Sequence, residues 1–227
     1  MLLNQRRCFL IARPSKFRSA NVEAALIVRS LALSYDIRCV LADLPKGFEV
    51  LFKQCPSSRE VLDMAVRLGL LHYSKSLVDA YEPVVSCLSK LVEEGVRVVC
   101  YLSLEELEEE RRLAVKVAQL TLRASIKRVD ERDLEEWLQV LDEYGEGSRG
   151  SLSQVVEALR AINDPITIIL TGLEGFSLAR ELRNEGFNVE LKAAGLPYLR
   201  NPLEVMVLKR LKGELTTDEL KTLINEY

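Results

Sequence analysis

The chain has 227 residues, of which 48% are apolar and 29% are charged, values that are ordinary for a globular protein. Its 34 acidic and 31 basic residues give a net charge of -3. This balance argues against a dedicated nucleic-acid binder, because such domains carry a clear basic excess. No apolar run approaches the roughly 18 residues that a membrane-spanning helix requires, so we expect no membrane partner.

The first residues give no targeting signal. The segment of residues 1–7 is short, polar and basic, and it leads directly into an apolar run without a small-residue cleavage site. We therefore expect no signal peptide and a cytoplasmic location.

The residues that usually carry metal and nucleophilic chemistry are sparse. His72 is the single histidine, and the 5 cysteines are scattered without a C-x-x-C pair, so we predict neither a zinc site nor a cofactor. Cys8, Cys39 and Cys100 fall inside apolar β-like runs, where a buried thiol is the expected role.

The first half of the chain alternates between strand-like and helix-like segments. Apolar runs predict strands at residues 8–12, 37–44 and 96–102. Amphipathic patterns predict helices at residues 21–34, 48–54, 57–68 and 76–94, and Ser57-x-x-Glu60 is a capping box for the third of these. Pro83 marks either a kink or the first turn of a new helix.

The second half begins with a helix-rich block. We predict helices at residues 103–127, from 130 to about 144, and from 151 or 153 to 162. The glycine-rich residues 145–150 predict a hinge or surface loop. Strands at 166–171 and 188–192 follow, with a helix at 174–185 between them. Pro202 and Thr216-x-x-Glu219 indicate two closing helices.

This order of elements predicts an α/β fold. Strands that are apolar throughout and separated by helices indicate about five mostly parallel strands, covered by helices on both faces. Residues 103–163 read as a helical insertion or cap between the third and fourth strands. We expect residues 1–227 to form a single domain.

Ligands of open parallel sheets bind beyond the carboxyl ends of the strands. Arg13 and Asp43 follow the first two strands and Glu174 follows the fourth, so right-handed crossovers should place all three on one edge. An exposed Arg13–Asp43 pair would contribute about 0–1 kcal/mol, and replacing either residue should hardly change the melting temperature. The candidate ligand-binding residues at this edge are Arg13, Ser15, Lys16, Asp43, Lys46, Gly172, Glu174 and Gly175.

Two kinds of chemistry fit these residues. Arg13, Lys16 and Lys46 suit an anion, and Asp43 with Glu174 suits a metal or acid-base work. The alternative is that all of them are solvated loop charges. The turn from Gly172 to Gly175 lacks the spacing of known phosphate loops, so a tight strand-to-helix turn is the simpler interpretation.

The frame FLIARPSKFRSANVEAALIV followed by VLADLPKGFEVL resembles the opening of TraB/ChaN-like α/β domains. In that family the first strand ends in a G-x-x-H loop and the second in an acidic residue followed by leucine, here Asp43-Leu44. The segment around Arg132 is similar to the family's arginine-bearing helix. The strand before Gly172 looks like the start of its second G-x-x-H unit.

The resemblance implies a degenerate member of that family. Ser15 and Gly175 stand where the two histidines are expected, and neither residue can replace imidazole as a metal ligand. What carries over is the fold and a ligand cleft at Asp43, Gly172 and Arg132, without metal-dependent hydrolysis.

Three functions remain open. The first is a non-catalytic binding or regulatory protein with an unknown protein partner. The second is an enzyme or sensor that binds a small anionic ligand, such as a nucleotide or a phosphorylated metabolite. The third is an assembly component, such as a homo-oligomer, that packs through the apolar faces of the helical block at residues 103–144.

Overall fold

The computed structural model describes residues 6–72 and 74–227, with side chains described outside residues 147–152. The chain divides into two compact units. Unit 1 contains residues up to 104 and residues 152–198, and unit 2 contains residues 105–151 and 199–227. No helix in the described ranges is both long enough and apolar enough to cross a membrane.

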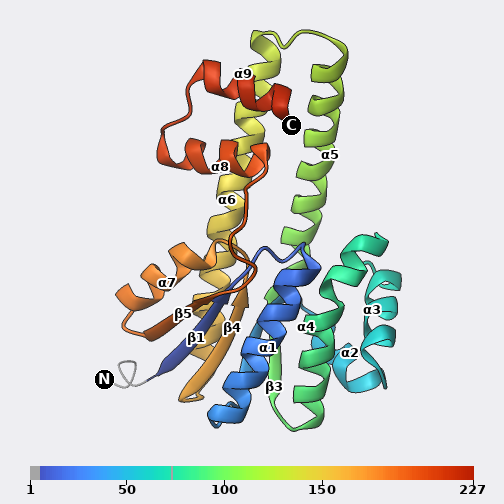
Figure 1. Cartoon of the computed structure of the whole chain (residues 1–227), viewed down its shortest axis with the longest axis vertical. Coiled ribbons are helices and arrows are strands. Elements are labelled where there is room, and N and C mark those ends of the chain that lie inside the picture. Colours follow the sequence, from blue (N-terminus) through green and yellow to red (C-terminus); the bar gives the residue numbers. More distant parts are fainter. Residues whose placement is uncertain (1–5, 73) are drawn as a thin grey trace. The chain divides into compact units, whose positions relative to one another are not determined.

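Unit 1 is built on a parallel sheet, as the sequence predicts (Figure 1). Its 5 strands lie in the order β3-β2-β4-β1-β5. The strands are β1 (Arg7–Ala12), β2 (Cys39–Pro45), β3 (Arg97–Leu102), β4 (Ile166–Thr171) and β5 (Asn188–Ala193). β1 lies between β4 and β5 and pairs with both in parallel register along its whole length.

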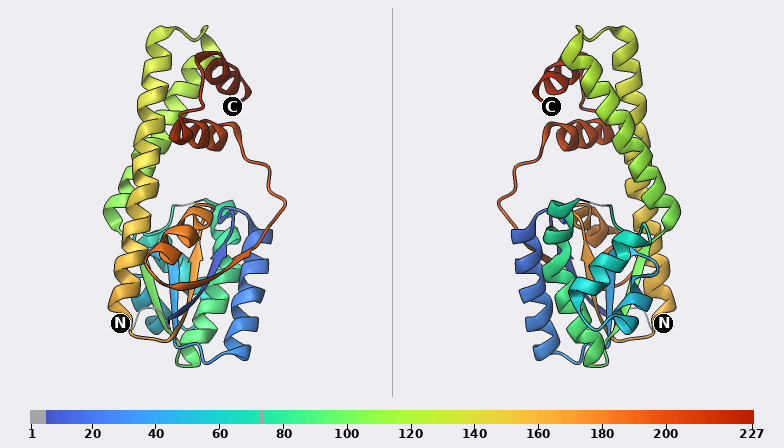
Figure 2. Two further views of the ribbon diagram at one scale, coloured as in Figure 1. Left: turned by 90° about the vertical axis from the view of Figure 1, so that its left-hand side faces the viewer. Right: turned by 90° about the vertical axis from the view of Figure 1, so that its right-hand side faces the viewer.

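Helices cover both faces of this sheet, which confirms the predicted architecture (Figure 2). One face packs on α1 (Arg18–Ser34), α2 (Phe48–Gln54), α3 (Ser58–Arg67) and α4 (Lys75–Glu93). The other face packs on α7 (Gly175–Asn184) and on the last part of α6 (Glu131–Ala161). Successive side chains of a strand point to opposite faces, so Phe9 and Ile11 join the first core while Cys8 and Leu10 join the second.

Unit 2 is helical and has a core of its own. It contains most of α5 (Leu104–Ile126), the first part of α6, α8 (Pro202–Lys212) and α9 (Thr217–Glu226). Trp137 is fully buried in this core, against apolar residues of the other three helices. Asn201 and Thr216 are the N-cap residues of these two closing helices, and each forms a capping box.

The helical part of the chain is therefore composed differently from the predicted insertion at 103–163. The C-terminal helices α8 and α9 join it, and residues 152–163 belong to unit 1. Sequence periodicity could not reveal either point, because both depend on contacts between segments distant in sequence. Whether residues 1–227 fold as a single domain stays a prediction.

The predicted loop at residues 145–150 is wrong, because α6 runs through this segment without interruption. Each glycine costs a helix about 1 kcal/mol relative to alanine. Packing on both sides offsets this cost: Trp137 and Leu141 are buried before the segment, and Val155 and Leu159 are buried after it. A Cβ on Gly145 would lie 2.7 Å from Cδ2 of Leu211, so the missing side chain makes room for α8.

Candidate functional site

The carboxyl ends of the strands place three predicted site residues together. Arg13 follows β1, Asp43 lies near the end of β2, and Glu174 follows β4, which pairs with both of these strands. The prediction that all three lie on the same edge of the sheet is confirmed. We call the following residues the carboxyl-edge cluster: Arg13, Asn21, Asp43, Tyr101, Thr171 and Glu174.

Arg13 lies at the centre of this cluster and is completely buried. Its guanidinium donates from Nη2 to Oδ1 of Asp43 at 2.8 Å, from Nε to Oδ1 of Asn21 at 2.7 Å, and from Nη1 to the carbonyl of Thr171 at 3.3 Å. Burial would lower the pKa of Arg13, but the adjacent Asp43 carboxylate outweighs it and raises the pKa. Arg13 is therefore a permanently charged group that the protein surrounds with its own acceptors.

This burial corrects two expectations. The pair of Arg13 and Asp43 is not an exposed loop contact, because the arginine side chain is 0% exposed and the aspartate side chain 8%. Removing one partner would leave an uncompensated buried charge, so we expect a large fall in the melting temperature instead of a small one. The sequence could not show this, because nothing in Ala12-Arg-Pro indicates which way the side chain turns.

Asn21 is a member of the cluster that sequence reasoning used only to begin a helix. It lies in the first turn of α1, is fully buried, and accepts from Arg13. Its Nδ2 donates to the carbonyl of Ser15 at 2.6 Å and to that of Phe17 at 3.1 Å. The side chain therefore fixes the loop after β1 and orients Arg13. The sequence signal for this role was a side-chain amide at the start of an otherwise apolar helical pattern.

Tyr101 closes the gap between two strands. β2 and β4 pair only from Cys39 to Leu41, and β2 is irregular between Ala42 and Pro45. The Tyr101 hydroxyl, from β3, donates to the carbonyl of Leu170 at 3.0 Å. Burial, together with the nearby carboxylates of the cluster, raises the pKa of Tyr101 well above its usual range, so the phenol stays protonated.

The turn after β4 already holds a carboxylate. Oε1 of Glu174 accepts from the backbone N–H of Gly172 at 2.9 Å and from the hydroxyl of Thr171 at 2.9 Å. A Cβ on Gly172 would lie 2.4 Å from Oε2 of Glu174, so the glycine lets this carboxylate approach the backbone. The backbone amide of Gly172 therefore binds the protein's own carboxylate instead of an external anion.

Gly175 has a packing role. It begins α7 and is buried, and a Cβ there would lie 2.5 Å from Cγ2 of Thr171 and 2.9 Å from Cβ of Ala12. Real Cβ atoms do not approach this closely. This position cannot carry an imidazole ring unless β1 and β4 move.

The remaining candidates at this edge are more open. Ser15 is half-buried, and Lys16 and Lys46 are exposed on the loops after β1 and β2. The backbone N–H of Lys46 donates to the carbonyl of Leu102, which ties its loop to the end of β3. These lysines are the exposed cations among the predicted ligand residues of unit 1.

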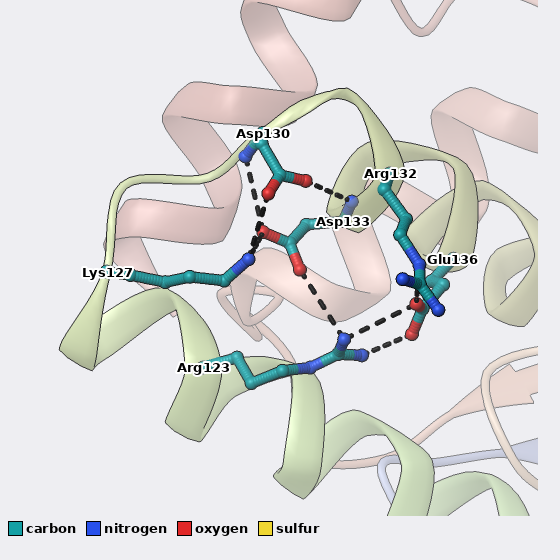
Figure 3. Close-up of polar contacts among 6 residues, drawn as sticks. All are labelled: Arg123, Lys127, Asp130, Arg132, Asp133 and Glu136. Carbon is teal, nitrogen blue, oxygen red and sulfur yellow. Dashed lines mark hydrogen bonds and ion pairs between the residues drawn. The ribbon is translucent and has the colours of Figure 1, made fainter.

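Arg132 does not belong to the carboxyl-edge cluster. It lies in unit 2, in the first turn of α6, with 87% of its side chain exposed. Its Nε lies 3.5 Å from Oε1 of Glu136, which Arg123 also contacts (Figure 3). The residues around it form an ion network between the end of α5 and the start of α6.

The centre of that network is a reciprocal cap (Figure 3). Oδ1 of Asp130 accepts from the N–H of Asp133 at 2.9 Å, and Oδ2 of Asp133 accepts from the N–H of Asp130 at 3.2 Å. Nζ of Lys127 lies 2.9 Å from both carboxylates. The Asp133 N–H and then Lys127 lower the pKa of Asp130 to about 2. These contacts fix the turn between two helices, and no open ligand position is needed to explain them.

Other features of the described residues do not add a reactive centre. No group of three or more histidine, cysteine or acidic side chains within the described ranges is placed to hold a metal ion. His72 is exposed. Cys8, Cys39 and Cys100 are buried free thiols, as predicted, and burial raises the pKa of Cys8 to about 12.

A groove of about 460 Å³ between α6 and α7 has a mixed polar and apolar lining that includes Glu157, Arg160 and Glu181.

Comparison with known proteins gives no relative: the chain matches no protein-family model, no curated protein and no solved structure.

Proposed function

We propose that this chain is a non-catalytic α/β protein that acts by binding a protein partner, in a binding or regulatory role. The observation that carries the proposal is the buried Arg13–Asp43 pair at the carboxyl edge of the sheet. This edge is where ligands of parallel sheets bind. Here Arg13 is enclosed by three protein acceptors, so its charge serves the fold and is not presented to a substrate.

The second acid of the proposed carboxylate pair is engaged in a similar way. Glu174 accepts from Gly172 and Thr171 and closes the turn after β4. A catalytic carboxylate must reach the proton that it transfers, and a metal-binding one must present free oxygens. The contacts of Glu174 instead support a structural role for this turn.

The resemblance to TraB/ChaN-like domains fits the same proposal, with this chain as a degenerate member of that family. Gly175, which stands at the second histidine position, has no room for any side chain. Ser15 stands at the first histidine position, and its backbone carbonyl accepts a hydrogen bond from Asn21. A chain of this kind retains a scaffold whose carboxyl edge is closed by its own side chains. We further propose a cytoplasmic location, consistent with its unpaired cysteines.

Binding of a small anion is the rival function, and one observation favours it. Lys16 and Lys46 are both exposed on loops at the carboxyl edge. They could hold a nucleotide or a phosphorylated metabolite above the cluster without Arg13. This rival requires no change in the buried contacts, so it is tested separately by ligand screening.

Turnover assays test the proposal. The purified chain would be incubated with Mg²⁺, Mn²⁺ or Zn²⁺ and with generic ester, peptide and phosphoester substrates. We expect no turnover above the background of a Glu174→Gln variant, which keeps the size of the side chain. Metal-dependent turnover that Glu174→Gln abolishes, while its circular dichroism spectrum stays unchanged, would overturn the proposal. Asp43→Asn provides a second variant, with its folded fraction measured in parallel.

A further inference from the structure

The exposed face of α5 is unusual for a helix in water. Leu113, Val117 and Leu120 form its buried face. The exposed positions between residues 113 and 126 are Ala114, Val115, Ala118, Gln119, Leu122, Ser125 and Ile126, and none of them is charged. The face of a surface helix opposite its core normally carries charged side chains.

The apolar members of this face form a continuous stripe, which we call the α5 seam: Val115, Ala118, Leu122 and Ile126. They are spaced by 3, 4 and 4 residues, so they share one side of the helix, and 11 residues of helix span about 16 Å. Val115 is 58% exposed, Leu122 is 61% exposed and Ile126 is 77% exposed. Ala118 gives the seam a low point where another helix can approach closely.

The charged residues of this part of the chain are separated by sign along the sequence. Residues 105–110 contain 5 acidic residues and no basic ones, and residues 111–129 contain 6 basic residues and no acidic ones. Part of this polarity complements the helix dipole, which favours acids at the N-terminus and bases at the C-terminus. In a second copy that runs in the opposite direction, Lys127 and Arg128, which follow the end of α5, come toward the acidic residues 105–110 of this helix.

We propose that the α5 seam is a homodimer interface in which two copies of α5 pack antiparallel about a two-fold axis near Ala118. A two-fold axis makes the same patch meet itself, so the patch must be self-complementary. This arrangement brings Val115 of one copy beside Leu122 of the other. It also brings the exposed Glu108 of one copy near the exposed Arg128 of the other, whereas a parallel pair would bring acid against acid.

The seam is short, so we expect the dimer to lie at the small end of specific interfaces and to dissociate reversibly. Each substitution is present twice in a symmetric dimer. This inference concerns unit 2 only and stands whether or not the proposed function of the chain is correct.

Sedimentation velocity over a range of protein concentrations tests the interface. We expect the wild-type chain to form dimers as its concentration rises. Leu122→Asp should weaken dimerisation at least tenfold, because it places a charge in an apolar contact. Leu26→Asp is the matched control, since Leu26 is a 67% exposed leucine on α1 of unit 1, and it should leave dimerisation unchanged. A wild-type chain that stays monomeric, or a Leu122→Asp variant that dimerises like the wild type, would overturn the proposal.

A charge exchange tests the antiparallel orientation. Glu108→Lys and Arg128→Glu should each weaken the homodimer, because both place like charges opposite each other. An equimolar mixture of the two variants restores both opposite-sign contacts in the heterodimer, so it should sediment with more dimer than either variant alone. If both variants are weakened and the mixture shows no recovery, the antiparallel arrangement is wrong. Both substitutions are at exposed positions, and circular dichroism would confirm that each variant is folded.

Discussion

Breaking the buried ion pair should destabilise the protein strongly. Arg13→Ala removes the donors to Asp43, Asn21 and the Thr171 carbonyl, and it leaves the buried Asp43 carboxylate without its cation. Removing one partner of such a pair typically costs about 3–5 kcal/mol. Asp43→Ala should cost a similar amount, because a guanidinium cannot neutralise itself by losing a proton.

The double variant separates the pair from its surroundings. Arg13→Met with Asp43→Leu leaves neither buried charge, so its loss should be below the sum of the losses in Arg13→Met alone and Asp43→Leu alone, with a coupling of about 0.5–3 kcal/mol. It should still be less stable than the wild type, because Asn21 and the Thr171 carbonyl lose a donor. Each unpaired buried polar group costs about 1–3 kcal/mol.

Urea denaturation followed by circular dichroism measures these differences. The matched control is Arg38→Ala, because Arg38 and Asp36 are also 2.8 Å apart but have side chains that are 67% and 76% exposed. Exposed pairs contribute about 0–1 kcal/mol. If Arg13→Ala costs no more than Arg38→Ala, the argument from burial is refuted.

Three further outcomes are expected. Gly175→Ala should cost about 1–3 kcal/mol in chemical denaturation, because its Cβ would lie 2.5 Å from Cγ2 of Thr171; an unchanged midpoint would show that the turn has room. The lowered pKa of Asp130 stabilises the native state above about pH 4, and this contribution is lost as the pH falls toward about 2. The acid-unfolding profile of Asp130→Asn should lack this pH-dependent loss. Identical profiles for the variant and the wild type would contradict the role of Lys127 and the cap. Trp137 is the single tryptophan and lies in unit 2, so a single folding domain predicts that its fluorescence and the circular dichroism signal change at the same urea concentration, whereas separate transitions would show independent units.

The sequence predicts the position of the site residues better than their environment. Apolar strands separated by helices imply a parallel sheet, and this alone places Arg13, Asp43 and Glu174 at one edge. The burial of Arg13 and Asp43 depends on Asn21 and Tyr101, which come from a helix and from a strand two positions away from β4. Local patterns do not report contacts of this kind.

The segment at residues 145–150 shows the same limit. Its glycines predict a loop, but packing before and after the segment keeps α6 helical. Arg132, which the resemblance places at the ligand cleft, pairs with Glu136 within α6, and its part in a ligand site stays a prediction. The helix caps at Ser57 and Thr216 were predictable because their signals lie within four residues.

A thermal-shift screen tests most directly the central claim that the chain binds no small ligand at the carboxyl edge of its sheet. Nucleotides, sugar phosphates and divalent metals would be added to the wild-type chain and to a variant that carries both Lys16→Ala and Lys46→Ala. A ligand present at a hundred times its dissociation constant stabilises a protein by about 2.7 kcal/mol, which such a screen detects readily. We expect that no compound raises the melting temperature of the wild-type chain more than that of the variant. A compound that raises the melting temperature of the wild type but not of the variant would contradict it and establish a ligand site at this edge.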